Sequence, residues 1–381
     1  MPNAFRGQSA LAKVAVKSIR EPLKMASDCL LVHCNKLWVR CGSRHFSSKG
    51  VDYRRFRAHP LCMRSLPEVL VAFLFTSCVP VIAQTDPHRQ LLEAYAFQYT
   101  AQTGMAIERA QALLDAGLLD HTDSGRAWIL LGICDEDEGR FADAQHAYEH
   151  AIQILGIEPQ ARNDYASALG DLGHLYYSMG QWQASANLRQ KAILIFEESG
   201  DHKGLAGAYI NLSALDLNQK HGKDCKKHLK IAFEELDRAL DVDDDDRAAA
   251  YSIRGQLALF DHNLAQAVED HRRALELWKR THGEDHPLTG WGYVLVGRAE
   301  AESGHLVQAA TEMQKGLSIL NRMLGPSNPR SMQAAIAYAK VLEGIGQHSE
   351  ATQLRTTASQ SLQMFNRSQC AGCMISSAAL R

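Results

Sequence analysis

Two histidines and a glutamate stand near the middle of the chain with the spacing of a zinc site. His146, Glu149 and His150 follow the order H-x-x-E-H. Histidines four residues apart lie on one face of a helix and can bind zinc together, with the glutamate acting as a base. If the chain is an enzyme, a zinc-dependent hydrolase using these three residues is the form that the sequence favours.

A second pair with possible chemistry lies near the C-terminus, where Cys370 and Cys373 have the spacing of a redox or metal-binding pair. The pair lacks the strand and helix pattern of a thioredoxin-type site, and no second pair completes a zinc centre. We therefore interpret these residues as two thiols of a tail that could oxidise together.

Carboxylates cluster between Asp241 and Asp246. A calcium loop needs glycine at its sixth place and glutamate at its twelfth, where this chain has Asp246 and Ser252. We interpret the cluster as a turn whose last carboxylates stabilise the start of a helix near Arg247.

Other catalytic patterns are absent from the sequence. It has no glycine-rich phosphate loop, no G-x-S-x-G elbow, and no Ser-His-Asp set tied to a strand. The net charge of -2 conceals a basic segment at residues 1–62, which leaves the rest of the chain acidic. An acidic body argues against a nucleic-acid partner. We expect no enzyme activity and no cofactor or metal.

Small residues recur along the body with a period of 40 to 42 residues. They are Gly132, Gly173, Ser213, Gly255, Gly297 and Ala339. Apolar and aromatic residues surround each of them at helical spacing. This regularity predicts about six similar helical units between residues 121 and 360.

The unit at 126–159 carries the fullest pattern, and it resembles the tetratricopeptide repeat (TPR), a pair of antiparallel helices. The matching residues are Trp128, Leu131, Gly132, Gly139, Phe141, Ala144, Tyr148, Ala151 and Pro159. The long period, with Pro287 and Pro329 in similar turns, resembles the kinesin light chain class of these repeats. The resemblance implies an all-α fold, a right-handed α-solenoid of antiparallel helix pairs that binds other chains.

The resemblance also implies which side chains face the concave groove of the solenoid. They are Arg126, Glu136, His174, Tyr177, Asn218, Gln256, Trp291, Arg298, Glu302 and Lys340. The Lys and Asn that would clamp a C-terminal carboxylate in some family members are missing. Our hypothesis is a non-catalytic scaffold whose groove binds a partner peptide or protein, with Trp291 and Tyr177 as anchors and Arg298 pairing an acidic group.

The repeat pattern bears on the zinc hypothesis as well. Tyr148 and Ala151 are core positions of the repeat, so His146, Glu149 and His150 should point away from the core. A solvated helix face is the simpler interpretation. A further alternative to a peptide-binding scaffold is a structural spacer that associates with itself as a homo-oligomer.

The sequence pattern of the N-terminal region predicts a targeting segment. Residues 63–84 contain Arg64, an apolar run and small residues before a polar start, as a signal peptide does. A membrane anchor is the alternative. Residues 1–62 form a basic extension, either disordered or not translated if synthesis starts at Met63. These features predict a secreted or periplasmic protein, membrane-bound only if 63–84 are retained, or an organellar one if 1–50 are a presequence.

The ends of the array and several of its units depart from the pattern. Residues 85–120 are helical in period without the full motif, which suits a cap, and 361–381 read as a flexible tail. Lys220 and His262 stand where a turn glycine is usual. Ser185 and Arg189 stand where the repeat usually has alanine and an aromatic residue.

Overall fold

The computed structural model describes residues 86–240, 242 and 244–369. These residues form fourteen α-helices and one short 3-10 helix, with no strand among them, so the predicted all-α class is confirmed. The predicted targeting segments, Asp241, Asp243 and the cysteine pair near the C-terminus lie outside the described residues.

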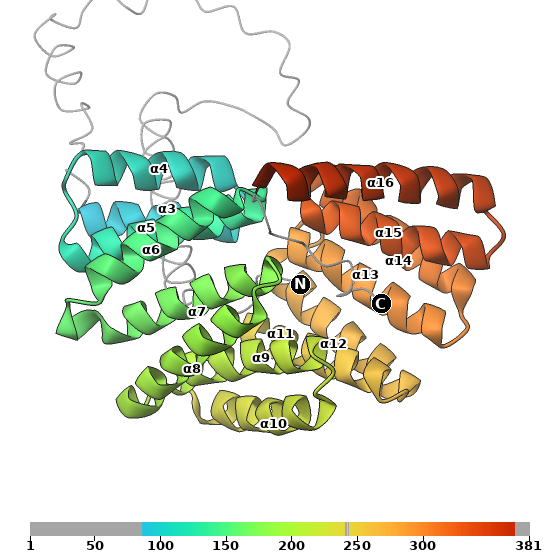
Figure 1. Ribbon diagram of the computed structural model, residues 1–381, viewed down its shortest axis with the longest axis horizontal. Coiled ribbons are helices and arrows are strands. Elements are labelled where there is room, and N and C mark those ends of the chain that lie inside the picture. The colour runs from blue at the N-terminus through green and yellow to red at the C-terminus, as the bar shows by residue number, and fades with distance from the viewer. Residues whose placement is uncertain (1–85, 241, 243, 370–381) are drawn as a thin grey trace, which may run out of the picture.

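The helices follow one another as seven antiparallel pairs (Figure 1). The first helices of the pairs are α3 (Pro87–Tyr99), α5 (His121–Glu138), α7 (Arg162–Ser178), α9 (His202–Asn218), α11 (Asp244–Phe260), α13 (Pro287–Glu302) and α15 (Pro329–Gly344). The second helices are α4 (Thr103–Asp115), α6 (Phe141–Leu155), α8 (Trp182–Ser199), α10 (Gly222–Arg238), α12 (Leu264–His282), α14 (Leu306–Leu324) and α16 (His348–Gln369). The 3-10 helix η1 (Pro159–Ala161) precedes α7. Residues 85–120 thus include α3 and α4, and α16 continues to Gln369.

In four of the pairs, a glycine of the first helix meets a large residue of the second. A side chain added at Gly132 would lie 2.6 Å from the ring of Tyr148, and one added at Gly297 would lie 2.5 Å from Met313. Carbon atoms cannot approach so closely, so glycine is required for the two helices to pack at this distance. The recurring small residues of the sequence are therefore contact points between paired helices.

The turns inside the pairs need one residue with a left-handed backbone. Gly139 and Gly180 adopt it with φ of 81° and 77°, at no steric cost. Lys220 and His262 adopt the same conformation with φ of 63° and 57°. The fold therefore imposes the turn geometry even where the sequence supplies a residue that disfavours it.

The first helices lie on the inside of the curve that the pairs describe. Each of α3, α5, α7, α9, α11 and α13 contacts the first helix of the next pair, whereas the second helices pack chiefly against the first helices of their own pair and the next. Elements on the inside of a bend come closer together than those on the outside. We call the surface formed by these first helices the inner face.

The curve is tight enough for the last pair to meet the second pair. The side-chain amide of Asn328 donates to the backbone carbonyl of Asp137 (2.8 Å), and the ring of Phe365 lies edge-on to that of Phe141 at 5.5 Å. Figure 1 shows the end of α16 beside α5 and α6. On α3, the hydroxyl of Tyr99 donates to Asp245 of α11 (3.4 Å). The array therefore curves far enough for the last pair to contact the second pair and for the first pair to contact the fifth.

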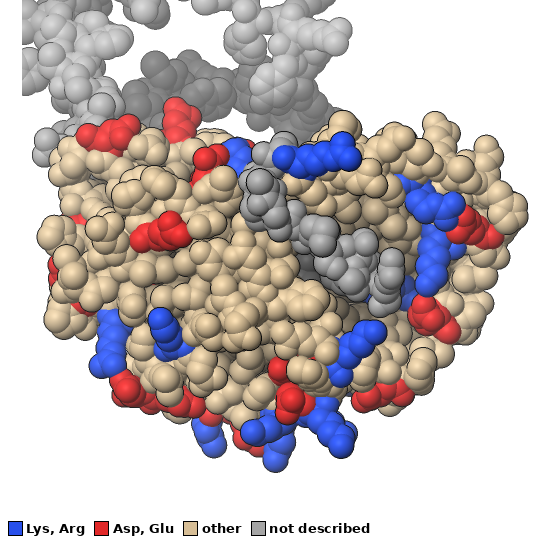
Figure 2. All heavy atoms as spheres, in the orientation of Figure 1, with Lys and Arg blue, Asp and Glu red and all other residues tan. Residues whose placement is uncertain are grey.

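The surface carries mixed charges. On the face drawn in Figure 2, acidic and basic side chains alternate along the margin over α8 to α12, and neither sign forms a continuous patch. None of the helices in the described ranges is both long and apolar enough to span a bilayer.

Candidate functional site

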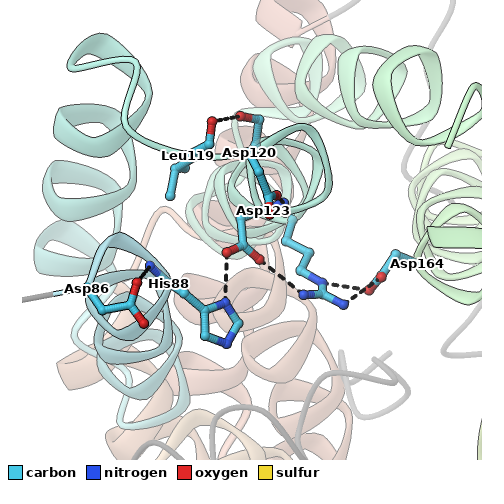
Figure 3. A network of polar contacts seen from close by, with 8 residues as sticks. Asp86, His88, Leu119, Asp120, Asp123 and Asp164 are labelled. Carbon is cyan, nitrogen blue, oxygen red and sulfur yellow. Dashed lines mark hydrogen bonds and ion pairs between the residues drawn. The ribbon is translucent and has the colours of Figure 1, made fainter. Parts of the chain in front are cut away.

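Arg126, the first of the predicted groove residues, is held by carboxylates from its own pair and the next. Its Nε and Nη2 donate to the two oxygens of Asp164 on α7 (3.1 and 2.8 Å), and its Nη1 donates to Asp123 (3.0 Å). Asp123 also contacts Nδ1 of His88 on α3 at 2.7 Å (Figure 3). Burial opposes the charge of Arg126, but these bonds outweigh it and raise the pKa of the guanidinium. Arg126 therefore links three helix pairs.

Further along the inner face, the predicted groove residues of α5, α7 and α9 contact one another. Glu136 accepts from the hydroxyl of Tyr148 (3.2 Å) and lies 2.7 Å from Nδ1 of His174. The amide of Asn218 donates to the hydroxyl of Tyr177 (3.0 Å). Burial raises the pKa of Tyr177 to about 12, so this hydroxyl stays protonated at neutral pH. The structure thus brings these residues together as a polar ladder between pairs.

The predicted residues of the later pairs are less closely connected. Trp291 is 3% exposed, while Lys340 and Glu302 are exposed and lie 3.8 Å apart. Gln256 is half-buried and bonds the backbone carbonyl of Ser252 on its own helix (3.4 Å). Burial lowers the pKa of Arg298, with Glu302 acting in the opposite direction.

A small pocket opens on the inner face between α7, α8 and α9. Its volume is about 30 Å³, enough for about two water molecules. Small side chains leave this space: a Cβ added at Gly170 would meet no atom of the described residues within 4 Å. The lining includes Ser167, Gly170 and Asp171 of α7, Arg189 and Phe196 of α8, Lys203, Gly207 and Asn211 of α9, and Asp246 at the start of α11.

Arg189 is the most deeply buried charge in this pocket, at 1% exposure. Its Nη1 donates to the backbone carbonyl of Asn211, and its guanidinium lies 5.3 Å from the centre of the Tyr177 ring. Among the described residues, its Nε and Nη2 have no hydrogen-bond partner. Burial lowers the pKa of Arg189 to about 10, so the side chain is still a cation at neutral pH. A buried cation with unused donors is costly unless a partner completes it.

The zinc-like residues of α6 occupy its outer face, away from the core. His146 and Glu149 are exposed, and the ring of His150 stacks on Trp128 at 4.8 Å. Across the part of the chain that the structure describes, no three His, Cys, Asp or Glu residues lie close enough to hold a metal ion. The motif therefore has the geometry of a helix surface, as the repeat pattern predicts.

Comparison with known families identifies the repeats. Residues 246–322, which span α11 to α14, match the family model described as tetratricopeptide repeat. This part of the chain consists of tetratricopeptide repeats. The predicted resemblance is thereby confirmed, by residues other than the 126–159 unit from which it was inferred. The search of curated proteins gave no significant match.

Two Rap proteins of known structure share the fold at low sequence identity, and a third structure is similar at a lower score. The Rap conjugation gene regulator of plasmid pLS20, in complex with the Phr* peptide, is 11% identical, with 83% of this chain and 81% of that chain covered at a TM-score of 0.57. A Rap protein complexed with Competence and Sporulation Factor is 12% identical over 79% and 92% of the chains, at 0.56. A Podosopora anserina protein described as a kinesin light chain is 16% identical over 54% and 99%, at 0.41.

Sequence reasoning did not assign Arg189 to the site. The TPR pattern expects an aromatic residue there, four positions after a small one, and the substitution was visible only as a departure from the pattern. Its neighbour in the motif, Ser185, donates to the backbone carbonyl of Gly173 at 2.6 Å. Ser185 and Arg189 thus lie at one crossing of helices, next to the pocket. Two neighbouring departures from the repeat pattern were the feature of the sequence that could have indicated this site.

Proposed function

We propose that this protein is a non-catalytic scaffold that binds a peptide segment of a partner protein on its inner face, at the pocket between α7 and α9. The observation that carries the proposal is the pocket itself. It combines open space at Gly170 with buried donors of Arg189 that the fold leaves unused. Such a combination of space and convergent polar groups is typical of a recognition site.

The neighbouring structures support a peptide as the ligand class. Two Rap proteins of similar fold are described as complexes with the Phr* peptide and with Competence and Sporulation Factor. An extended segment also suits a surface built from successive first helices, because each helix adds side chains along one line.

The proposal is tested by filling the pocket. Gly170→Phe places a ring in open space on α7 and should leave the helix packing intact. Peptides selected from a random display library on the wild-type protein should bind this variant at least tenfold more weakly. Gly104→Phe on α4 is the matched control, because a side chain there also meets no atom within 4 Å and the position is outside the pocket. A selection without enriched peptides, or peptides indifferent to Gly170→Phe, would overturn the proposal.

A further inference from the structure

The chain uses one edge of the guanidinium group repeatedly to hold carboxylates. Arg126 binds Asp164 through Nε and Nη2, and Arg254 binds Asp270 through the same two atoms, at 2.8 and 2.6 Å. These two nitrogens carry parallel N–H bonds that match the two oxygens of a carboxylate. This pairing is the geometry to which we compare Arg189.

Arg189 presents the same edge without an occupant. Its third nitrogen, Nη1, is bonded to the backbone of Asn211, which fixes the plane of the group. The Nε and Nη2 atoms are buried and have no hydrogen-bond partner among the described residues. A Cβ added at Gly173 would lie 3.2 Å from Cγ of Arg189, so the glycine gives this side chain room. Neither nitrogen is exposed to solvent, so the pocket must widen before a ligand reaches the fork.

We infer that the Nε and Nη2 atoms of Arg189 bind a carboxylate of the partner peptide, which enters the pocket beside Gly170. The inference rests on the proposed function and names the chemistry that the partner must carry. The carboxylate is the side chain of an aspartate or glutamate, or the C-terminus of the peptide. Both have the planar pair of oxygens that the fork accepts.

Other charges at the pocket favour a carboxylate over a phosphate. Lys203 lies 3.7 Å from Asp246, and Asp171 also lines the pocket without bonding the two free nitrogens of Arg189. Two acidic side chains nearby repel a doubly charged group more strongly than a singly charged one.

The inference is tested with three pools of random pentapeptides that need no known partner. The first pool is amidated and free of acidic residues, the second is amidated and contains one glutamate, and the third is acid-free with a free C-terminal carboxylate. Each pool is incubated with the full-length protein, and bound peptides are counted by mass spectrometry. We expect at least tenfold enrichment of the second or third pool over the first, and the enriched pool identifies the source of the carboxylate.

Variants then assign the preference to the fork. Arg189→Gln should abolish the enrichment of the acidic pool, and Arg189→Lys should lose most of it, because lysine keeps the charge without the paired donors. Arg162→Gln is the matched control, since Arg162 is an exposed arginine of α7 paired with Glu198. If Arg189→Gln fails to fold, Arg189→Lys and Gly170→Phe still report on the site.

The outcomes separate the inference from the proposed function. Equal enrichment of all three pools, or an acidic preference that survives Arg189→Lys and Arg189→Gln, overturns the carboxylate site while peptide binding stands. Retention of no pool at all overturns both.

Discussion

The amide nitrogen of Asn328 lies 2.8 Å from the backbone carbonyl oxygen of Asp137, which precedes it by 191 residues. Arg330 reaches the carboxylate of the same aspartate at 3.6 Å. Asn328 also caps α15 through its side-chain oxygen, which accepts from the backbone nitrogen of Arg330 (3.0 Å). One side chain thus starts a helix of the last pair and joins it to the second pair. An open solenoid has no such contact, because its terminal repeats meet only their neighbours.

The first prediction concerns this closure. Phe365→Ala removes the ring that packs on Phe141 and on the turn at Gly139. We expect the ends of the array to separate, with faster amide hydrogen exchange in α15, α16 and the turn after α5, and a larger radius of gyration by X-ray scattering. Met364→Ala is the control, because Met364 is 63% exposed. Unchanged exchange in Phe365→Ala would show that the closure does not depend on this contact.

The second prediction concerns pH. His271 is buried on α12, where neither ring nitrogen has a partner in the part of the chain that the structure describes. Burial lowers its pKa to about 3, with Arg298 adding to the effect. In the unfolded chain the His271 imidazole binds a proton below about pH 6.5, whereas in the folded protein it stays neutral until the pH is much lower. The free energy of unfolding should therefore be unaffected by His271 above pH 6.5 and fall as the pH drops below it, by about 2 kcal/mol at pH 5.

Urea denaturation of His271→Phe at pH 7.5 and pH 5 checks this. Phenylalanine suits the aromatic position of the repeat and binds no proton. Between pH 7.5 and pH 5, the free energy of unfolding of the variant should therefore fall by about 2 kcal/mol less than that of the wild type. Burial also lowers the pKa of His286, which adds a pH dependence of the same sign in the wild type and in the variant. His146→Phe, at an exposed position of α6, should behave as the wild type. Parallel losses in wild type and His271→Phe would contradict the assignment.

The sequence predicted the parts of this fold that depend on near neighbours. The spacing of Gly132 and Tyr148 within one repeat gives the packing of a helix pair, and Pro287 and Pro329 begin helices as their fixed φ favours. The contact between Asn328 and Asp137 could not be predicted, because it depends on small rotations accumulated over five helix pairs. The burial of Trp291 has a similar cause, since a repeat position indicates a helix face and leaves its exposure to the curvature.

The sequence likewise predicted the helix positions of the site residues and could not predict their contacts between pairs. Groove positions such as Arg126 and Asn218 were located on the correct helices, but their pairing with Asp164 and Tyr177 depends on side-chain reach between pairs. Whether the donors of Arg189 form hydrogen bonds depends on the positions of acceptor atoms in neighbouring helices. A repeat pattern contains no such information.

The third prediction concerns the turns. Lys220 and His262 hold the left-handed conformation that glycine adopts without strain. Lys220→Gly should raise the free energy of unfolding by about 0.5 to 1 kcal/mol, because relief of strain exceeds the entropy gained by the unfolded chain. Gly180→Ala, the reverse change at an equivalent turn with φ of 77°, should lower it by about 1 kcal/mol. Chemical denaturation measures both, and a destabilised Lys220→Gly would mean that the lysine side chain contributes contacts that offset the strain.

The fourth prediction separates packing from recognition at Trp291. This side chain is 3% exposed and belongs to the main apolar core. Trp291→Ala should therefore cost about 3 to 5 kcal/mol of stability through the cavity it leaves. Trp291→Phe keeps most of the volume and should bind selected peptides as the wild type does. Phe260→Ala is the comparison. Because Phe260 is 44% exposed, its replacement should lower the free energy of unfolding only slightly. If Trp291→Phe folds normally and loses peptide binding, then the indole is reached by the partner, and the inner face must open at α13 when the partner binds.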